Sequence, residues 1–576
     1  MNTINAQDRT VRLRFVETSD VHGMFFPTDF TTGKQVFGTM ARVSSYVKRK
    51  RADYGDRLIL LENGDILQGQ PTNYYWNAVN TNCENIASAI VNYMNYDAQV
   101  PGNHDIETGH ACYDKWIKEL KCPVLGANII NTQTGEPYTQ AYKMLERDGV
   151  RIAILGMITP AIPNWLSKDA WRGMRFEDMV TSARKWMDII QEKEKPNVVI
   201  GLFHSGYQGG ITTAEYEENA ARAVAAQVGG FDVIMCGHDH NPYSENVVCR
   251  TGGSTLILNP GSNARKVGEA EITITLNSDG KLVNKMIKGR LVSMDPESTD
   301  KEYMEHFKAD IEKLQAFTSQ KIGSFGNTIY TRDCFFGSAP FTDWIHNVQL
   351  AVTKADISFN SPLSFDVTIN KGDVRMSDMF NLYKYDSSLY VVKMKGSEIR
   401  KYLEMSYALW TNTMSSQEDN IMLLADTHSD SEKHGFINPY YNFDSAAGIE
   451  YEVDVTKPEG EKIKITKRSN GQPFSEDEWY SVVMNSYKAN GGGELITKGA
   501  GIDKDSLDAR VTMRSEHDLR YYLMEEIKNK GIVNAKSNNN WRFVPEAWTK
   551  SAIERDRELI FHGNSSQIHP NTREIK

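Results

Sequence analysis

Residues 197–206, NVVIGLFHSG, decide the fold class of this chain. A run of apolar and β-branched side chains ends abruptly in histidine, serine and glycine, which is how a buried strand passes into a turn. The pattern recurs in LRFVETSDVHG (13–23), RLILLENGD (57–65), DAQVPGNHD (97–105) and FDVIMCGHDH (231–240). The first half of the chain therefore contains repeated strands that end in polar turns.

Helical patterns lie between these strands. Apolar residues recur at spacings of three and four in residues 43–51, 83–93, 179–194 and 215–228. Strands that alternate with helices predict an α/β core. In such sheets the ligand site forms at the strand ends, so the polar turns can meet in space although they lie far apart in the sequence.

The length of the chain predicts two domains. Its 576 residues exceed the length at which a single core stops growing, roughly 250–300 residues. Residues 295–325 are charged and have helical spacing at Tyr303, Phe307, Ile311 and Leu314. We expect a first domain over 1–295, a linking helix and hinge over 296–324 with its pivot near Gly323 and Gly326, a second domain over 325–550, and a tail over 551–576 without an assigned role.

Composition limits the partners. The net charge of −10 argues against a nucleic-acid polymer, because such a partner selects a basic surface. No apolar run approaches the roughly 18 residues that span a bilayer, and no protein partner is evident. The first residues lack the apolar segment of a secretory signal, so the chain is either cytoplasmic or has lost a leader. The six cysteines form no CxxC motif, and we expect mostly buried thiols.

The polar turns carry metal-binding side chains. Asp20 and His22 stand two residues apart, and His238 and His240 repeat that spacing. Nitrogen and oxygen donors without a thiolate suit Zn, Mn, Co or Fe in an open site. The set is too large for one tetrahedral ion and suits two ions about 3.5–4 Å apart that share a carboxylate. Asp65, alone in its turn, is the predicted bridge. The candidate ligands are Asp20, His22, Asp65, Asn103, His204, His238 and His240.

The five blocks SDVHG, NGD, GNHD, FHSG and GHDH resemble, in this order, the calcineurin-like binuclear metallophosphoesterase superfamily over about the first 290 residues. The resemblance implies a four-layer β-sandwich flanked by helices. It also implies which residues hold which ion. Asp20, His22 and His240 would hold the first, Asn103, His204 and His238 the second, and Asp65 both.

Two cations at these positions would attract phosphate and would lower the pKa of a water molecule between them. The resulting hydroxide could then attack phosphorus in line. In the resembled family the histidine of GNH, here His104, serves the leaving oxygen. Family members often place an aspartate three residues later to orient that histidine. This chain has Glu107 there, and Asp105 is the alternative. The remaining histidines, His346 among them, fall in no motif and are expected on the surface or on helix faces.

Blocks of the second half, among them YYNFDSAAGIEYEVDVTKP (440–458) and YSVVMNSYKANGGGELI (480–496), resemble the α+β C-terminal domain of the 5'-nucleotidase family. YNFD and NSYKANGGG are closest to its 2',3'-cyclic-nucleotide 2'-phosphodiesterase/3'-nucleotidase branch. That branch clamps the base between two aromatic rings, which implies Tyr441 and Tyr487 here. Gly491 and Gly492 would let the backbone approach the ligand. No arginine of the 5'-nucleotidase pattern follows Asn360, which argues against a strict 5'-nucleotidase.

Three functions remain open. The favoured one is two-metal hydrolysis of 2',3'-cyclic nucleotides and nucleoside 3'-monophosphates. The alternatives are a hydrolase of 5'-nucleotides or nucleotide sugars, and a noncatalytic nucleotide-binding protein. The resemblance implies a small nucleotide as substrate and a periplasmic or secreted location, although a cytoplasmic one is compatible with the sequence.

Overall fold

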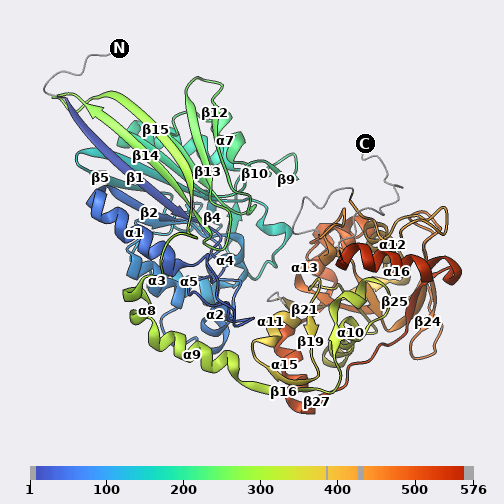
Figure 1. Cartoon of the computed structure of the whole chain (residues 1–576). Coiled ribbons are helices and arrows are strands. Elements are labelled where there is room, and N and C mark those ends of the chain that lie inside the picture. The colour runs from blue at the N-terminus through green and yellow to red at the C-terminus, as the bar shows by residue number, and fades with distance from the viewer. Residues whose placement is uncertain (1–7, 384–386, 426–433, 563–576) are drawn as a thin grey trace. The chain divides into compact units, whose positions relative to one another are not determined.

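The structure is a computed structural model that describes residues 8–383, 387–425 and 434–562. Its backbone divides into two compact units, residues 1–318 and 319–576, and each is described by itself. Figure 1 shows the first unit in blue and green and the second mainly in yellow to red.

The first unit contains two large sheets. In the five-stranded sheet, β1, β2 and β3 are parallel, whereas β14 pairs antiparallel with both β1 and β15. In Figure 1 the blue β1 runs beside the green β14, although most of the unit separates them in the sequence. The strand order is β15 (Leu282–Ser293), β14 (Lys266–Leu276), β1 (Arg9–Thr18), β2 (Leu58–Glu62) and β3 (Ala98–Gln99).

The second sheet of this unit is six-stranded. Its central strand β8 is the apolar run of residues 198–204, and all of its residues are buried. A strand covered on both faces reads as a continuous apolar run, which explains the pattern of NVVIGLFH. The order is β12 (Tyr243–Val248), β13 (Ser254–Asn259), β11 (Val233–Cys236), β8 (Val198–His204), β6 (Val150–Ile158) and β5 (Tyr142–Arg147).

The two sheets pack against each other through one apolar cluster that includes Phe15, Leu61 and Ile200. Separate clusters pack helices on the outer faces, α1 (Met40–Tyr54) and α3 (Ile86–Met94) on the five-stranded sheet and α6 (Met179–Ile189) and α7 (Ala221–Gln227) on the six-stranded sheet. The layers are helix, sheet, sheet and helix. The predicted α/β class and four-layer architecture are confirmed.

The helix predicted over 215–228 is wrong in its first part. Residues Glu217–Asn219 form strand β10, which pairs with β9 (Gly209–Thr212), and α7 begins only at Ala221. The segment ITTAEYEEN contains β-branched and aromatic residues that favour strands as well as the spacing that favours a helix. Pairing with β9 stabilises the strand. The error hid a residue of the functional site, Glu218.

The predicted linking helix forms two helices, α8 (Lys301–His306) and α9 (Lys308–Ser319), which pack on the first unit. Tyr303, Phe307 and Leu314 are buried in the cluster that includes Phe26. The residues predicted as a pivot, Gly323 and Gly326, lie in and directly after strand β16 (Lys321–Phe325), which pairs with β20 (Gly372–Arg375) and β27 (Ile532–Val533). Both edges of β16 are therefore paired, and a pivot at Gly323 and Gly326 stays a prediction.

The second unit is α+β. Its five-stranded sheet has the order β22 (Ser445–Ala447), β18 (Ile357–Asn360), β25 (Trp479–Asn485), β21 (Ser388–Lys395) and β26 (Val511–Asp518). A second sheet combines β24 (Ile463–Arg468), β23 (Ile449–Asp454) and β28 (Trp541–Val544). Helices α10 (Pro340–Thr353), α12 (Gly396–Trp410) and α15 (Leu519–Lys530) complete the unit.

Part of the predicted tail forms a helix that packs on the second unit. Helix α16 (Glu546–His562) buries Ala552 and Leu559 in the core of the second unit. Asp556 is fully buried and accepts a hydrogen bond of 2.8 Å from the backbone N–H of Met422. Residues 551–562 are therefore part of this unit, and 563–576 lie outside the described residues.

Two whole-chain expectations concern cysteines and membranes. All six cysteines are free thiols. Cys236, Cys249 and Cys334 are buried, and the other three are half-buried. Within the described ranges, no helix has both the length and the apolar character that a membrane crossing requires.

His346 was expected on the surface or on a helix face, and it does lie on α10, but its ring is fully buried. Nδ1 is 2.8 Å from the hydroxyl of Ser358, and Nε2 is 3.2 Å from that of Ser445. Hydroxyls can donate to or accept from either ring nitrogen, so the neutral ring is satisfied without a counter-ion. Burial lowers the pKa of His346 to about 3.

This buried imidazole predicts acid sensitivity of the second unit. The unfolded chain takes up a proton near pH 6.5, whereas the folded ring stays neutral to about pH 3. Between these values the free energy of unfolding should fall by up to about 1.4 kcal/mol per pH unit. Urea unfolding at pH 7 and pH 5 should show a flatter pH dependence for His346→Gln than for wild type. The exposed control His562→Gln should keep the wild-type slope, and equal slopes for all three proteins would contradict the prediction.

Candidate metal centre

The ends of five strands from the two sheets of the first unit converge on one site. β1 and β2 lead into the turns with Asp20, His22 and Asp65, and β8 and β11 lead into those with His204, His238 and His240. β3 leads to α4 (Asn103–Glu107), which begins with Asn103. The seven predicted ligands thus come together as the strand-end argument requires, and their contacts show how.

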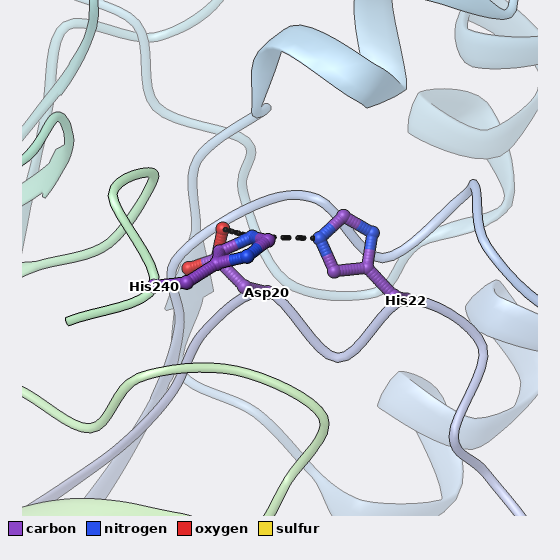
Figure 2. A group of neighbouring side chains, drawn as sticks. All are labelled: Asp20, His22 and His240. Carbon is purple, nitrogen blue, oxygen red and sulfur yellow. Dashed lines mark hydrogen bonds and ion pairs between the residues drawn. The ribbon is translucent and has the colours of Figure 1, made fainter. Parts of the chain in front are cut away.

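Asp20, His22 and His240 form the first group. The Nε2 atoms of the two histidines are 3.1 Å apart, and Nε2 of His240 lies 3.3 Å from Oδ1 of Asp20. Figure 2 shows the two rings and the carboxylate directed toward one another. One donor atom from each residue lies within 4.8 Å of the others. These three side chains could bind one cation.

Asn103, His204 and His238 form the second group. Oδ1 of Asn103 lies 3.1 Å from Nε2 of His204 and 2.8 Å from Nδ1 of His238. The amide oxygen and the two imidazole nitrogens offer three ligand atoms to a cation. This group could bind a second cation.

Asp65 connects the two groups. Its Oδ2 lies 3.3 Å from Nε2 of His204, and donor atoms of Asp20, Asp65 and His204 fall within 4.8 Å of one another. Asp65 is 1% exposed. The carboxylate therefore stands where a ligand shared by two ions would stand.

The remaining ring nitrogens are fixed by hydrogen bonds. Nδ1–H of His204 donates to the carbonyl of Asn63 at 2.6 Å, and Nδ1–H of His22 donates to that of Gln68 at 3.1 Å. A carbonyl only accepts, so Nδ1 carries a proton in both rings, and Nε2 is the atom of each ring that could bind a cation. Such partners set the tautomer and direction of metal-binding histidines.

Glu218 plays this part for His238, and sequence reasoning missed it. Its Oε1 accepts from Nε2–H of His238 at 2.9 Å, which leaves Nδ1 for the second group. Its other oxygen accepts the N–H of Ile211. The carbonyl of Glu218 also accepts the hydroxyl of Ser205, the residue after His204. The strand-like composition of residues 211–219 was the available signal.

The backbone at the ligands is strained. Asp20, His22, Asp65, His238 and His240 all have positive φ, between 49° and 74°. Residues other than glycine rarely adopt this region, and its cost is of order 1–3 kcal/mol each. Such outliers gather at functional sites, where the surrounding structure holds them in place. Most of the candidate ligands share the feature, which is consistent with a functional site in these turns.

Two motif glycines make room for carboxylates. A Cβ at Gly102 would lie 2.1 Å from Oδ1 of Asp65, and one at Gly237 would lie 2.7 Å from Oδ2 of Asp20. Neither position could hold a side chain without moving its carboxylate. The glycines of GNHD and GHDH are therefore required by close approach.

The electrostatics favour positive charge. Although burial opposes the charged form, Asp65 raises the pKa of His204 to about 10. Burial likewise opposes ionisation of Asp65, yet His204 and His104 hold its pKa well below the usual range. In the metal-free protein, protons on imidazoles thus neutralise the carboxylates. Divalent cations would replace those protons.

His104 lies beside this centre. Its backbone N–H donates to Oδ1 of Asp65 at 2.8 Å, and its ring centroid is 5.5 Å from that of His22. Nδ1 lies 2.7 Å from Oε2 of Glu107. Burial disfavours the imidazolium, but Asp65 and Glu107 raise the pKa of His104 to about 9.

Asp105 is not placed to orient His104. Its carboxylate accepts the backbone N–H groups of Asp65, Ile66, Leu67 and Gly102 at 2.8–3.0 Å. These bonds shape the turn that carries Asp65. Of the two alternatives, the structure places Glu107 on the ring of His104 and assigns Asp105 to the turn.

In the second unit, contacts link the two blocks that carry Tyr441 and Tyr487. Both tyrosines are half-buried, on the short helical turns Tyr440–Asn442 and Ser486–Ala489. Nζ of Lys488 donates to Oδ1 of Asn442 at 2.9 Å, so residues adjacent to the two rings are in contact. A Cβ at Gly492 would lie 2.5 Å from the ring of Tyr487.

Two further candidates lie in the same unit. Asn360 ends β18 and is 5% exposed, and its Nδ2 has no hydrogen-bond partner among the described residues. Gly491 has a φ of 101°, which requires glycine. An unpaired buried donor is compatible with a ligand contact.

Two family models match separate parts of this chain. Residues 13–242 match the family model of calcineurin-like phosphoesterases, and residues 315–498 match that of the 5'-nucleotidase C-terminal domain. A 2',3'-cyclic-nucleotide 2'-phosphodiesterase/3'-nucleotidase of Yersinia enterocolitica is 26% identical, over 94% of this chain and 90% of that protein. A 5'-nucleotidase of Vibrio cholerae is 24% identical, over 69% of this chain and 76% of that protein.

The fold has solved counterparts. A Staphylococcus aureus protein described as a 5'-nucleotidase superposes with a TM-score of 0.75 at 20% identity, over 92% of this chain and all of that one. This likeness concerns the fold and extends over both units.

Proposed function

Because this chain combines a calcineurin-like phosphoesterase domain with a 5'-nucleotidase C-terminal domain, we propose that it hydrolyses 2',3'-cyclic nucleotides and nucleoside 3'-monophosphates. At the coarser level the protein is a metal-dependent phosphoric ester hydrolase of nucleotides. The observation that carries the proposal is the convergence of imidazole, amide and carboxylate donors in two groups joined by Asp65.

The donor set fits two divalent ions. The described groups contain no thiolate, and they include the two carboxylates of Asp20 and Asp65. Zn, Mn, Co or Fe accept such ligands. When bound, two such ions supply positive charge for the phosphate oxygens and increase the acidity of water at the site. Asp20, His22 and His240 would hold one, Asn103, His204 and His238 the other, and Asp65 both.

His104 would serve the leaving group. The carboxylate of Glu107 favours the protonated ring, and the hydrogen bond from Nδ1–H to Glu107 leaves Nε2 as the nitrogen that would donate to the substrate. A proton delivered to the departing ribose oxygen prevents build-up of alkoxide charge. Glu107 would fix the orientation of the ring.

The second unit would bind the nucleoside. We assign base stacking to Tyr441 and Tyr487, because a stacking pair tolerates any base. Asn360, Gly491 and Gly492 would contribute the polar and backbone contacts around it. The link between their blocks through Lys488 and Asn442 supports this assignment.

The preference for the 3' position rests on two observations. The relative named for cyclic and 3' activity aligns over nearly the whole chain, whereas the 5'-nucleotidase aligns over 69% of it. The segment after Asn360, SPLSFDVTINKGDV, contains no arginine. Hydrolysis of 5'-nucleotides or nucleotide sugars is the second candidate.

A comparison of three substrates tests the proposal. Phosphate release from 3'-AMP should exceed that from 5'-AMP by about tenfold or more in kcat/KM, the equivalent of one good binding contact. Opening of 2',3'-cyclic AMP to 3'-AMP should be detected by chromatography under the same metal conditions. Faster release from 5'-AMP would favour the second candidate. No hydrolysis of any phosphoester by the metal-loaded protein would leave a noncatalytic nucleotide-binding protein.

A further inference from the structure

A buried ammonium group lies between the two blocks that carry the stacking tyrosines. Lys488 is 3% exposed, and its Nζ donates to Oδ1 of Asn442 at 2.9 Å. The same Nζ lies 3.4 Å from Oδ1 of Asp444, which is 1% exposed. Lysine is rarely so buried unless it is paired, and here both of these contacts of Nζ fall on one segment, residues 442–444.

Helix α12 and Phe436 also hold the segment 442–444, and the ring centroids of Phe436 and Phe443 lie 5.2 Å apart. The hydroxyl of Ser406 donates to the carbonyl of Asp444 at 2.9 Å, and the hydroxyl of Tyr402 donates to the Asp444 carboxylate. Phe443 stacks on Trp410, with ring centroids 5.5 Å apart. These contacts anchor the block of Tyr441 to the core. They do not connect it to the block of Tyr487.

Lys488 makes that connection. It follows Tyr487 directly, and Asn442 follows Tyr441 directly. Between them runs the backbone of Gly493, where a Cβ would lie 2.3 Å from Oδ1 of Asn442 and 3.2 Å from Nζ of Lys488. The glycine run therefore leaves the space through which the lysine reaches Asn442. Tyr441 and Tyr487 are thus each adjacent in sequence to one partner of the hydrogen bond between Lys488 and Asn442.

The buried ion pair of Lys488 and Asp444 needs an explanation other than stability. Burial of an ammonium and a carboxylate is costly, and a well-packed apolar pair is often as stable or more so. Buried ion pairs are retained in some proteins because they fix one arrangement among several. A single fixed arrangement is what two aromatic rings need if a base is to fit between them, since preorganisation removes the ordering cost from binding.

We propose that Lys488 is a positioning residue for nucleoside binding, which sets the placement of Tyr441 relative to Tyr487 through its contacts with Asn442 and Asp444. The inference rests on the proposed stacking role of the two tyrosines. It assigns no chemical step to Lys488, which acts through the residues it holds.

Adenosine binding to the metal-loaded full-length protein tests this role, because adenosine has no phosphate and reports on the nucleoside contacts alone. In isothermal titration calorimetry, Lys488→Met should raise the Kd at least about tenfold, in the range expected for one lost stacking contact. Lys488→Met leaves the Asp444 carboxylate unbalanced, so the double variant Lys488→Met/Asp444→Asn is measured beside it. Its melting temperature should recover toward wild type while the Kd stays high. The matched control Lys498→Met removes an exposed lysine paired with Glu494 on the same segment and should bind as wild type does.

Each outcome decides a different point. A Kd for Lys488→Met within twofold of wild type overturns the positioning role. Recovery of both affinity and melting temperature in the double variant also overturns it, since Lys488 would then only balance a charge. If Tyr441→Ala and Tyr487→Ala bind adenosine as wild type does, the stacking pair fails and the inference falls with it. The three-substrate assay reports separately on the hydrolytic activity.

Discussion

Replacement of Asp65 with asparagine should reduce kcat/KM for 3'-AMP by about 10³-fold or more, roughly 4 kcal/mol of transition-state stabilisation. The change removes one negative charge and almost no volume. Asp65 lies between the two donor groups, with Oδ2 3.3 Å from His204 and Oδ1 bonded to the N–H of His104. An amide retains the shape but is a weaker ligand for two cations at once. Metal content by mass spectrometry should fall below that of wild type in the same preparation.

The matched control for this change is Asp279→Asn, an exposed aspartate in the turn between β14 and β15. It should keep wild-type metal content and activity. A folded Asp65→Asn protein with full metal content and activity within tenfold of wild type would show that Asp65 is not shared between two ions.

Replacement of His104 with alanine should have an effect that depends on the leaving group. For 3'-AMP, whose ribose oxygen leaves as a strong base, loss of a general acid should lower kcat by about 10²–10⁴-fold. For a nitrophenyl ester, whose leaving group needs no proton, the loss should stay below about tenfold. Steady-state kinetics with both substrates at the same pH measures the difference.

Two controls separate proton donation from structural damage. Glu107→Gln keeps a hydrogen-bond partner for Nδ1 but removes one of the two charges, with Asp65, that raise the pKa of His104, so it should show the same leaving-group trend at smaller size. His306→Ala, an exposed histidine of the same unit, should change neither substrate. Equal losses on both substrates in His104→Ala would exclude the general-acid role.

The sequence was sufficient to predict the strands and the turns of the site. Residues 198–203 carry no polar side chain because both faces of their strand are covered, and this pattern can be recognised in the sequence alone. Gly102 stands directly before the candidate ligand Asn103 because its backbone lies too close to Asp65 for a side chain, so this packing requirement is visible in the motif GNHD. At these positions the local sequence pattern and the tertiary structure favour the same residues, and short motifs could therefore identify them.

Other residues depend on partners distant in the sequence. Glu218 supports His238 from a strand that helical spacing concealed, because its pairing with β9 outweighs the local preference. His346 is buried on a helix and satisfied by two hydroxyls from separate strands, which no spacing reveals. The sequence also could not show that Glu107 points toward His104 whereas Asp105 points away from it.

Metal stoichiometry tests the central claim most directly. Purified full-length protein is stripped with a chelator, reloaded with Zn, Mn, Co or Fe in turn, and analysed by mass spectrometry together with 3'-AMP hydrolysis. We predict that each active form holds two ions per chain and that activity returns only as the second ion binds. Full hydrolysis by the stripped protein, or by a form that holds a single ion, would contradict the account.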